Sequence, residues 1–128
     1  MKVLFVEDSA LLRRAMVKAV HEAGYKTVEA ENGMEALARL RAHGPTINLV
    51  VLDWNMPVMS GYEVLVKMRS QEEYSDIPVL MATSDGVEED VKKAIKAGAT
   101  GYLVKPFTPE ALVKQIANIL KSNTGSVS

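Results

Sequence analysis

The sequence predicts an α/β fold, a doubly wound five-stranded parallel sheet with helices on both faces. The first observation is that short apolar runs alternate five times with longer segments of helical periodicity along the 128 residues. The second is that capping residues and helix-stopping glycines separate these segments. Because crossovers between parallel strands are right-handed, the C-terminal ends of all the strands should meet at one edge of the sheet, where open sheets bind ligands.

The first two strands flank the first helix. The apolar run Val3–Val6 is the first expected strand, and the helix expected from Ser9 to Ala23 ends at Gly24. Its inward face is expected to carry Leu12, Ala15, Met16, Ala19 and Ala23. Lys26 to Ala30 alternates polar and apolar residues, which indicates an edge strand with one wet face.

Two helices surround the third strand. Asn32 should cap the second helix, with Glu35 three residues later, and Gly44-Pro45 should end it. The run Leu49–Leu52 is the third strand, and Ser60-Gly61-Tyr62-Glu63 is a capping box that opens the third helix. Its inward residues are expected to be Val64, Leu65 and Met68.

The fourth strand–helix unit repeats the pattern. Val79–Ala82 is the fourth strand, Asp85 with Glu88 can cap the helix that follows, and Gly98 ends that helix. The apolar stripe of this helix is expected to be Val87, Val91, Ala94 and Ile95. Tyr102–Val104 is the fifth strand.

The last helix starts at Thr108-Pro109-Glu110, where proline takes the first helical position. Its inward residues are expected to be Leu112, Ile116, Ile119 and Leu120. We therefore expect one domain over residues 1–121 and a short polar C-terminal tail over residues 122–128, frayed at the end.

Composition fits one globular domain, with 48% hydrophobic and 24% charged residues. The net charge of −1, without blocks of like charge, gives no electrostatic case for direct binding of nucleic acid or a membrane surface. Since the chain has no cysteine, disulfides, thiol catalysis and thiolate metal sites are excluded, and a cytoplasmic location is expected. No apolar stretch approaches the ~20 residues that span a bilayer.

Four of the five strands end on polar residues suited to phosphoryl chemistry. These residues are Glu7-Asp8, Asp53, Thr83 and Lys105-Pro106. If the strands are neighbours, three carboxylates, a hydroxyl and an ammonium meet at one edge of the sheet. Such a set predicts a site for a divalent cation and a transferable phosphoryl group.

Asp53 is the candidate for the reacting atom, because a carboxylate can take a phosphoryl group to form an acyl phosphate. Asp8 and Asp53 can supply carboxylates to Mg²⁺, with Glu7 helping directly or through water and Asn55 offering a backbone carbonyl. Two carboxylates ~4 Å apart repel by about 4 kcal/mol at an effective dielectric near 20. A metal preference is therefore expected in the free site.

Lys105 is the fixed positive charge, expected to pair with Asp53 at rest and with a phosphoryl oxygen afterwards. The Thr83 hydroxyl can donate to another phosphoryl oxygen, and Pro106 invites a cis peptide bond. Taken singly, each feature has a structural reading as a helix cap, a hydrogen-bonded aspartate or a turn. Their joint occurrence at four strand ends favours a shared site.

At these residues the chain resembles the receiver domain of two-component response regulators, over Lys2 to about Lys121. The motifs are Val6-Glu7-Asp8-Ser9, Asp53-Trp54-Asn55-Met56-Pro57 with Ser60-Gly61, Thr83-Ser84, Gly98-Ala99 with Gly101-Tyr102, and Lys105-Pro106-Phe107. The resemblance implies a flavodoxin-like fold with strand order 2-1-3-4-5, of which a member of this family is a standard example. Because no output domain accompanies these motifs, the chain is similar to single-domain, chemotaxis-type regulators.

The resemblance implies that Asp53 is the phosphoacceptor for the phosphohistidine of a sensor histidine kinase or phosphotransfer domain. Mg²⁺, or Mn²⁺ by the same oxygen chemistry, would be held by Glu7, Asp8, Asp53 and the Asn55 carbonyl. Thr83 and Lys105 would bind the phosphoryl group. The protein would then be a signalling module and not a metabolic enzyme, promoting only its own phosphorylation and dephosphorylation.

The resemblance also implies a switch in which Tyr102 moves inward as Thr83 shifts toward the phosphate. A downstream target would bind the surface formed by the Gly86–Ala97 helix, the strand through Tyr102 and the Thr108–Lys121 helix. That face is also a candidate place for Lys92, Lys93 and Lys96. Asn55 and Asp85 stand where the family tunes the lifetime of the phosphate. The resemblance leaves open a monomer or a phosphorylation-dependent dimer.

Three alternatives remain at this point. The chain can be a receiver fragment of a larger response regulator or hybrid kinase. It can be a phosphohydrolase of the haloacid dehalogenase type, although Asn55 occupies the place of the second aspartate that serves there as general acid. It can also be an interaction domain that never takes phosphate, against which the intact set of site residues argues.

Overall fold

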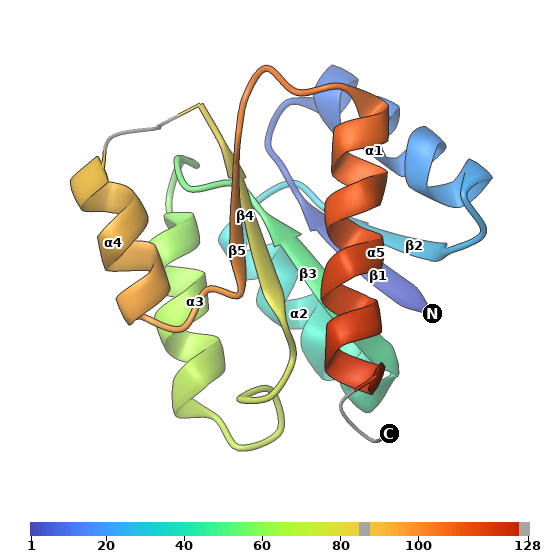
Figure 1. The fold of residues 1–128 in the computed structure, drawn as a ribbon. Helices are drawn as coiled ribbons and strands as arrows, with labels where there is room; N and C mark the ends of the chain where they lie inside the picture. Colours follow the sequence, from blue (N-terminus) through green and yellow to red (C-terminus); the bar gives the residue numbers. More distant parts are fainter. Residues whose placement is uncertain (85–87, 126–128) are drawn as a thin grey trace.

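The strands and helices follow one another in strict alternation (Figure 1), in a computed structural model that describes residues 1–84 and 88–125. The strands are β1 (Lys2–Val6), β2 (Lys26–Ala30), β3 (Ile47–Leu52), β4 (Val79–Thr83) and β5 (Gly101–Val104). The helices are α1 (Ala10–Glu22), α2 (Gly33–His43), α3 (Gly61–Ser70), α4 (Glu88–Lys96) and α5 (Pro109–Gly125), with a short 3₁₀ turn, η1 (Gly44–Thr46).

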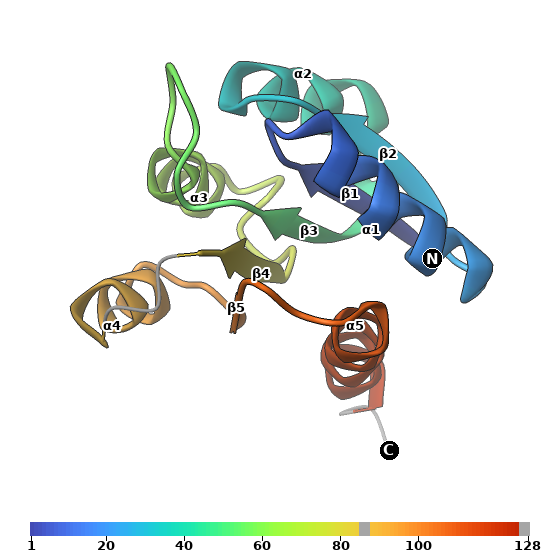
Figure 2. The ribbon, with the colours of Figure 1, turned by 90° about the horizontal axis from the view of Figure 1, so that it is seen from above.

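The five strands form one parallel sheet in the order β2-β1-β3-β4-β5. This confirms the predicted fold class and strand order. Seen from above, α1 and α5 cover one face of the sheet, and α2, α3 and α4 cover the other (Figure 2). Alternate β1 residues supply the two cores, since Val3 and Phe5 pack with α1 and α5 while Leu4 and Val6 pack with α2 and α3.

Side-chain caps open four of the described helices, and those at Asn32, Ser60 and Thr108 stand where the sequence predicts helix starts. The Leu12 N–H donates to Ser9 Oγ at 3.3 Å, and the Glu35 N–H donates to Asn32 Oδ1 at 2.8 Å. At α3 the Glu63 N–H donates to Ser60 Oγ at 3.2 Å, and at α5 the Ala111 N–H donates to Thr108 Oγ1 at 3.0 Å. These bonds satisfy backbone donors that have no partner within the first turn of a helix.

The predicted inward face of α1 was partly wrong. Ala15 and Ala23 are exposed, whereas Val20 is fully buried, and the buried stripe runs through Met16 and Val20 with Leu12 at its edge. The larger side chains set the rotation of the helix, because they bury more apolar area against the sheet than alanine does.

Two further expectations need correction. Ile95 is 49% exposed, and Ala94 is the buried residue of α4, while Asp85 and Val87 lie outside the described residues. The last helix continues to Gly125 instead of ending at Lys121, because neither proline nor glycine interrupts the chain before that residue. Among residues 1–84 and 88–125, no helix has the length and apolar character needed to cross a bilayer.

Candidate functional site at the C-terminal edge of the sheet

Backbone hydrogen bonds beyond the strand ends bring the candidate residues to one edge. The Asp53 N–H donates to the Val6 carbonyl at 3.1 Å, which extends the pairing of β3 with β1 by one residue. The Lys105 N–H donates to the Thr83 carbonyl at 2.8 Å and extends the pairing of β5 with β4 in the same way. The pairing of the strands thus fixes the heights at which these side chains leave the sheet.

Three carboxylates converge at this edge. One oxygen from each of Glu7, Asp8 and Asp53 lies within 4.8 Å of the other two. Glu7 and Asp53 are buried, with exposures of 2% and 6%, whereas Asp8 is exposed. Hard divalent cations prefer carboxylate oxygens and usually keep several waters. A cluster that is buried on one side and open on the other fits such an ion, so these residues could hold a metal.

Lys105 supplies the positive charge of the cluster and contacts two of the carboxylates. Its Nζ lies 2.5 Å from Glu7 Oε1 and 3.5 Å from Asp53 Oδ2. The expected pairing with Asp53 is present, but the shorter contact is with Glu7, whose side chain is one methylene longer than that of aspartate. The other Glu7 oxygen accepts the Ser9 N–H at 3.1 Å. Both oxygens of Glu7 are therefore hydrogen-bonded within the protein.

Burial raises the pKa of both buried carboxyls. For Asp53, desolvation is the main cause, and the Lys105 charge and a hydrogen bond from the Asn55 N–H oppose it. For Glu7, desolvation again dominates the raised pKa and the hydrogen bond from Lys105 opposes it, while the Asp53 charge adds to the rise. The free site therefore holds its negative charge at a cost, which a bound cation would relieve.

This raised pKa predicts how stability depends on pH. Because the pKa of Glu7 and of Asp53 is higher in the folded state, the contribution of these groups is fully present below about pH 4 and is lost as the pH rises through the folded values. In chelator, the free energy of unfolding should decline as the pH is raised from about 4 toward neutrality, and less steeply in Asp53→Asn. Urea unfolding across this range measures it, and an equal slope in both proteins would refute the assignment.

The other predicted site residues lie around the cluster. Thr83 is fully buried at the end of β4, Tyr102 on β5 is half-buried against the core, and Asn55 is exposed in the loop after Asp53. The Lys105-Pro106 peptide bond is cis. Asp85 lies outside the described residues. The functional roles assigned to these residues stay predictions.

The sequence analysis missed Arg13, which hydrogen-bonds to the backbone of the acidic pair Glu7-Asp8. Its Nη1 donates to the Glu7 carbonyl at 2.6 Å, and its Nε pairs with Glu29 Oε1 of the edge strand at 3.0 Å. The arginine joins the β1–α1 turn to β2 while leaving the Glu7 carboxylate to Lys105. Nothing in the spacing of the sequence signals this contact, because Glu29 is 16 residues away.

Gly61 has a second role that was missed, since it was predicted only as part of a cap and of a motif carrying the resemblance. Its N–H donates to the Trp54 carbonyl at 2.9 Å, which brings the start of α3 against the segment that carries Asp53. A Cβ on Gly61 would lie 2.0 Å from the Asp53 carbonyl oxygen. Only glycine therefore permits this approach of the two backbones.

Comparison with known proteins agrees with this geometry. The family model of the response regulator receiver domain matches residues 3–117. The chain belongs to this family. Chemotaxis protein CheY1 of Helicobacter pylori is 40% identical to this receiver domain over 124 residues, which are 96% of this chain and 99% of that protein. The CheY homologue of Campylobacter jejuni is 38% identical over 126 residues, which are 98% and 96% of the two chains.

Solved structures agree with the same assignment. Chemotaxis protein CheY4 of Vibrio cholerae is 38% identical to this receiver domain with a TM-score of 0.87, covering 92% of this chain and 97% of that one. A CheY-like receiver domain protein from Methanospirillum hungatei has a TM-score of 0.89 at 25% identity, covering 98% and 97%. The protein is thus a CheY-like receiver domain of two-component signalling, a class of signalling proteins and not of classical enzymes.

Proposed function

We propose that this receiver domain takes a phosphoryl group on Asp53 from the phosphohistidine of a histidine kinase or a phosphotransfer domain. The convergence of three carboxylates and the Lys105 ammonium supports this proposal most strongly. Phosphoryl transfer depends mainly on positioning and charge neutralisation, and the edge of this sheet provides the groups for both. The protein would promote only its own phosphorylation and dephosphorylation.

In the transfer, a carboxylate oxygen of Asp53 attacks phosphorus while the P–N bond of the phosphohistidine breaks. The electron pair of that bond returns to the imidazole nitrogen, so Asp53 carries an acyl phosphate and the histidine is released. Lys105 Nζ lies 3.5 Å from Asp53 Oδ2 and would pair with a phosphoryl oxygen once the group has been transferred. The hydroxyl of the buried Thr83 would donate to another phosphoryl oxygen.

Four residues are proposed to hold the divalent cation. The clustered carboxylates of Glu7, Asp8 and Asp53 and the backbone carbonyl of Asn55 would together supply an all-oxygen donor set, which suits Mg²⁺ and accepts Mn²⁺. When bound, the ion neutralises negative charge on the carboxylates and on the phosphoryl oxygens. Asn55 and Asp85 are proposed to set the lifetime of the acyl phosphate.

Phosphorylation is proposed to favour a state in which Thr83 has moved toward the phosphate and Tyr102 has turned inward. The α4-β5-α5 face would then change its affinity for a downstream target protein. Exposed apolar side chains on this face, Ile95 at 49% and Val104 at 43%, support a protein partner there. The proposed partners are proteins, without direct binding of nucleic acid or membrane.

The relatives suggest the setting of this switch. CheY1 of Helicobacter pylori and the CheY homologue of Campylobacter jejuni are chemotaxis proteins, and the match covers 99% and 96% of their lengths. We infer a stand-alone regulator of chemotaxis that works in the cytoplasm and acts on a target such as a flagellar switch. Whether phosphorylation leaves a monomer or forms a dimer is decided by sedimentation of the protein with and without a phosphoryl mimic.

The test uses Trp54, the single tryptophan, which is buried next to Asp53. Adding Mg²⁺ and then beryllofluoride should change its fluorescence in two saturable steps, because each addition alters the charge beside the indole. Chelator should reverse the first step, and Asp53→Asn should lose the second. An unchanged signal, with metal binding established by calorimetry, would contradict the assigned site.

A further inference from the structure

The helix α4 is held to the molecule by few buried side chains. Ala94 is its buried residue within Glu88–Lys96, and Ile95 beside it is exposed. A surface helix normally gains most of its stability from the apolar face that it packs. With so little buried area, the position of α4 depends on the individual side chains that tie it to its neighbours.

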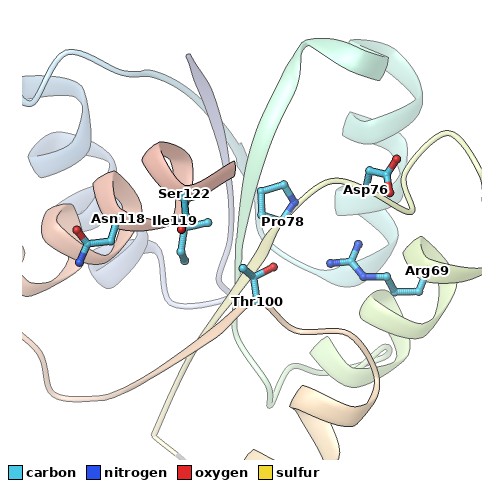
Figure 3. A pocket seen from close by; sticks show the side chains of 7 residues that line it. All are labelled: Arg69, Asp76, Pro78, Thr100, Asn118, Ile119 and Ser122. Carbon is cyan, nitrogen blue, oxygen red and sulfur yellow. The ribbon is translucent and has the colours of Figure 1, made fainter. Parts of the chain in front are cut away.

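Arg69 of α3 ties down the C-terminal end of α4. Its Nε and Nη2 donate to the Gly98 carbonyl at 3.1 and 2.9 Å, and its Nη1 donates to the Ile77 carbonyl at 2.8 Å. The arginine lines a cavity of about 420 Å³ at the N-terminal ends of β4 and β5, where it points toward Thr100 and Pro78 (Figure 3). This end of α4 is therefore fixed near the N-terminal edge of the sheet, and Asp53 lies at the C-terminal edge.

Lys93 ties the middle of α4 to the Asp53 segment through two aromatic rings. Its Nζ lies 4.4 Å from the ring centroid of Tyr62, in the first turn of α3. The Tyr62 ring in turn lies 5.5 Å from the Trp54 ring, tilted by 51°. Trp54 directly follows Asp53, and Gly61 beside Tyr62 donates its N–H to the Trp54 carbonyl.

We propose that this stack of Lys93, Tyr62 and Trp54 couples the occupancy of Asp53 to the position of α4. Tyr62 and Lys93 are positioning residues that hold α4 against α3 in the arrangement that the structure shows. The inference deepens the proposed function and rests on it. It adds a connection on the α3 side of α4, separate from the proposed Thr83–Tyr102 switch, which lies on the β4–β5 side.

The same contacts distinguish the three lysines of α4. Lys93 is directed against α3, whereas Lys92 pairs with Glu88 at 3.3 Å along the exposed face of its own helix. A partner that binds α4 would therefore meet Lys92 directly, and it would change Lys93 only by shifting the helix. Lys92 serves as the matched control, since it is the adjacent residue with the same charge.

Coupling of this kind is reciprocal and of limited size. An exposed cation–π contact changes an equilibrium by about twofold to fivefold. A change at Asp53 that displaces Trp54 weakens the contact between Lys93 and Tyr62. By linkage, a partner that shifts α4 changes the affinity of the Asp53 site for a phosphoryl mimic by the same factor. Loss of the Lys93 or Tyr62 side chain should therefore change the affinity of the Asp53 site for a phosphoryl mimic by about twofold to fivefold.

The first experiment examines the stack in the free protein, without metal or phosphate. Unfolding equilibria of Tyr62→Leu, Lys93→Met and the double variant form a thermodynamic cycle. We expect a coupling of about twofold to fivefold for this pair and none when Lys92→Met replaces Lys93→Met. Tyr62→Phe and Lys93→Arg should retain the coupling, because both keep a ring face and a cation. Absence of coupling between Tyr62 and Lys93 overturns the proposal.

The second experiment measures the equilibrium affinity of the Mg²⁺-loaded protein for beryllofluoride, a phosphoryl mimic at Asp53, by titration calorimetry. Lys93→Met and Tyr62→Leu should each change this affinity by about twofold to fivefold and in the same direction, while Lys92→Met and Lys93→Arg match the wild type. Opposite effects of the two variants, or an effect no larger than that of Lys92→Met, overturn the proposal. If the wild type does not bind beryllofluoride, the proposed function and the coupling fail, whereas the stack itself is still decided by the first experiment.

Discussion

Asp53→Asn is expected to lose all Mg²⁺-dependent incorporation of phosphate from acetyl phosphate, whereas the wild type is labelled. The amide keeps the shape of the side chain and removes the nucleophilic oxygen. The variant should remain folded, because Lys105 keeps its 2.5 Å contact with Glu7 and one buried negative charge is removed. Transfer of labelled phosphate, resolved by gel electrophoresis at neutral pH, measures the effect. Equal labelling of the two proteins would contradict the role of Asp53.

Asp8→Asn is the matched control for this experiment, because it removes a carboxylate of the same cluster without touching the nucleophile. Loss of a metal ligand should lower the affinity for Mg²⁺ by about tenfold or more, judging from the cost of losing outer-shell partners. Labelling of Asp8→Asn should therefore recover at high Mg²⁺ concentration, whereas labelling of Asp53→Asn should not. Recovery in both variants would mean that another residue accepts the phosphate.

Gly61→Ala is expected to destabilise the protein by about 3 kcal/mol or more. The added Cβ would lie 2.0 Å from the Asp53 carbonyl oxygen, 2.8 Å from the Asp53 carbonyl carbon and 3.0 Å from the Trp54 Cα. These are backbone atoms, so the clash can be relieved only by moving the segment that carries the nucleophile. Urea unfolding measures the loss, and the folded fraction should also take phosphate more slowly than the wild type.

Gly101→Ala provides the comparison for Gly61→Ala. A Cβ there would meet Leu80 Cδ1 at 3.2 Å and Ile119 Cδ1 at 3.4 Å, both ends of flexible side chains. We expect a clearly smaller loss of stability, of at most about 1–3 kcal/mol, because these side chains can rotate away. If the two variants lose the same stability, the close approach of Gly61 to Asp53 is not what makes glycine necessary.

The fold could be predicted from the sequence because its signals are local. Apolar runs, capping residues such as Asn32 and Ser60, and the stop at Gly98 each act within a few residues of the chain. The convergence of the strand ends then follows from the handedness of the crossovers. For the same reason the acidic cluster and the pairing of Lys105 with Asp53 could be anticipated, although the shorter contact of Lys105 with Glu7 could not.

The contacts that were missed depend on distances between parts of the chain that the sequence pattern does not relate. Arg13 contacts Glu29 of the next strand, and Lys93 lies over Tyr62 of another helix. The closer pairing of Lys105 with Glu7 than with Asp53 depends on one methylene in a side chain 98 residues away. The exposure of Ile95 depends on how α4 sits on the sheet, which helical periodicity alone does not determine.

The central claim is that this edge of the sheet directs a phosphoryl group to one carboxylate. Borohydride reduction of the protein after phosphorylation in Mg²⁺ tests it most directly, because an acyl phosphate is reduced to an alcohol whose position a peptide mass spectrum reveals. The account predicts conversion of Asp53 to homoserine, dependent on both Mg²⁺ and the phosphodonor. Reduction at another carboxylate, or none in a protein shown to bind Mg²⁺, would contradict it.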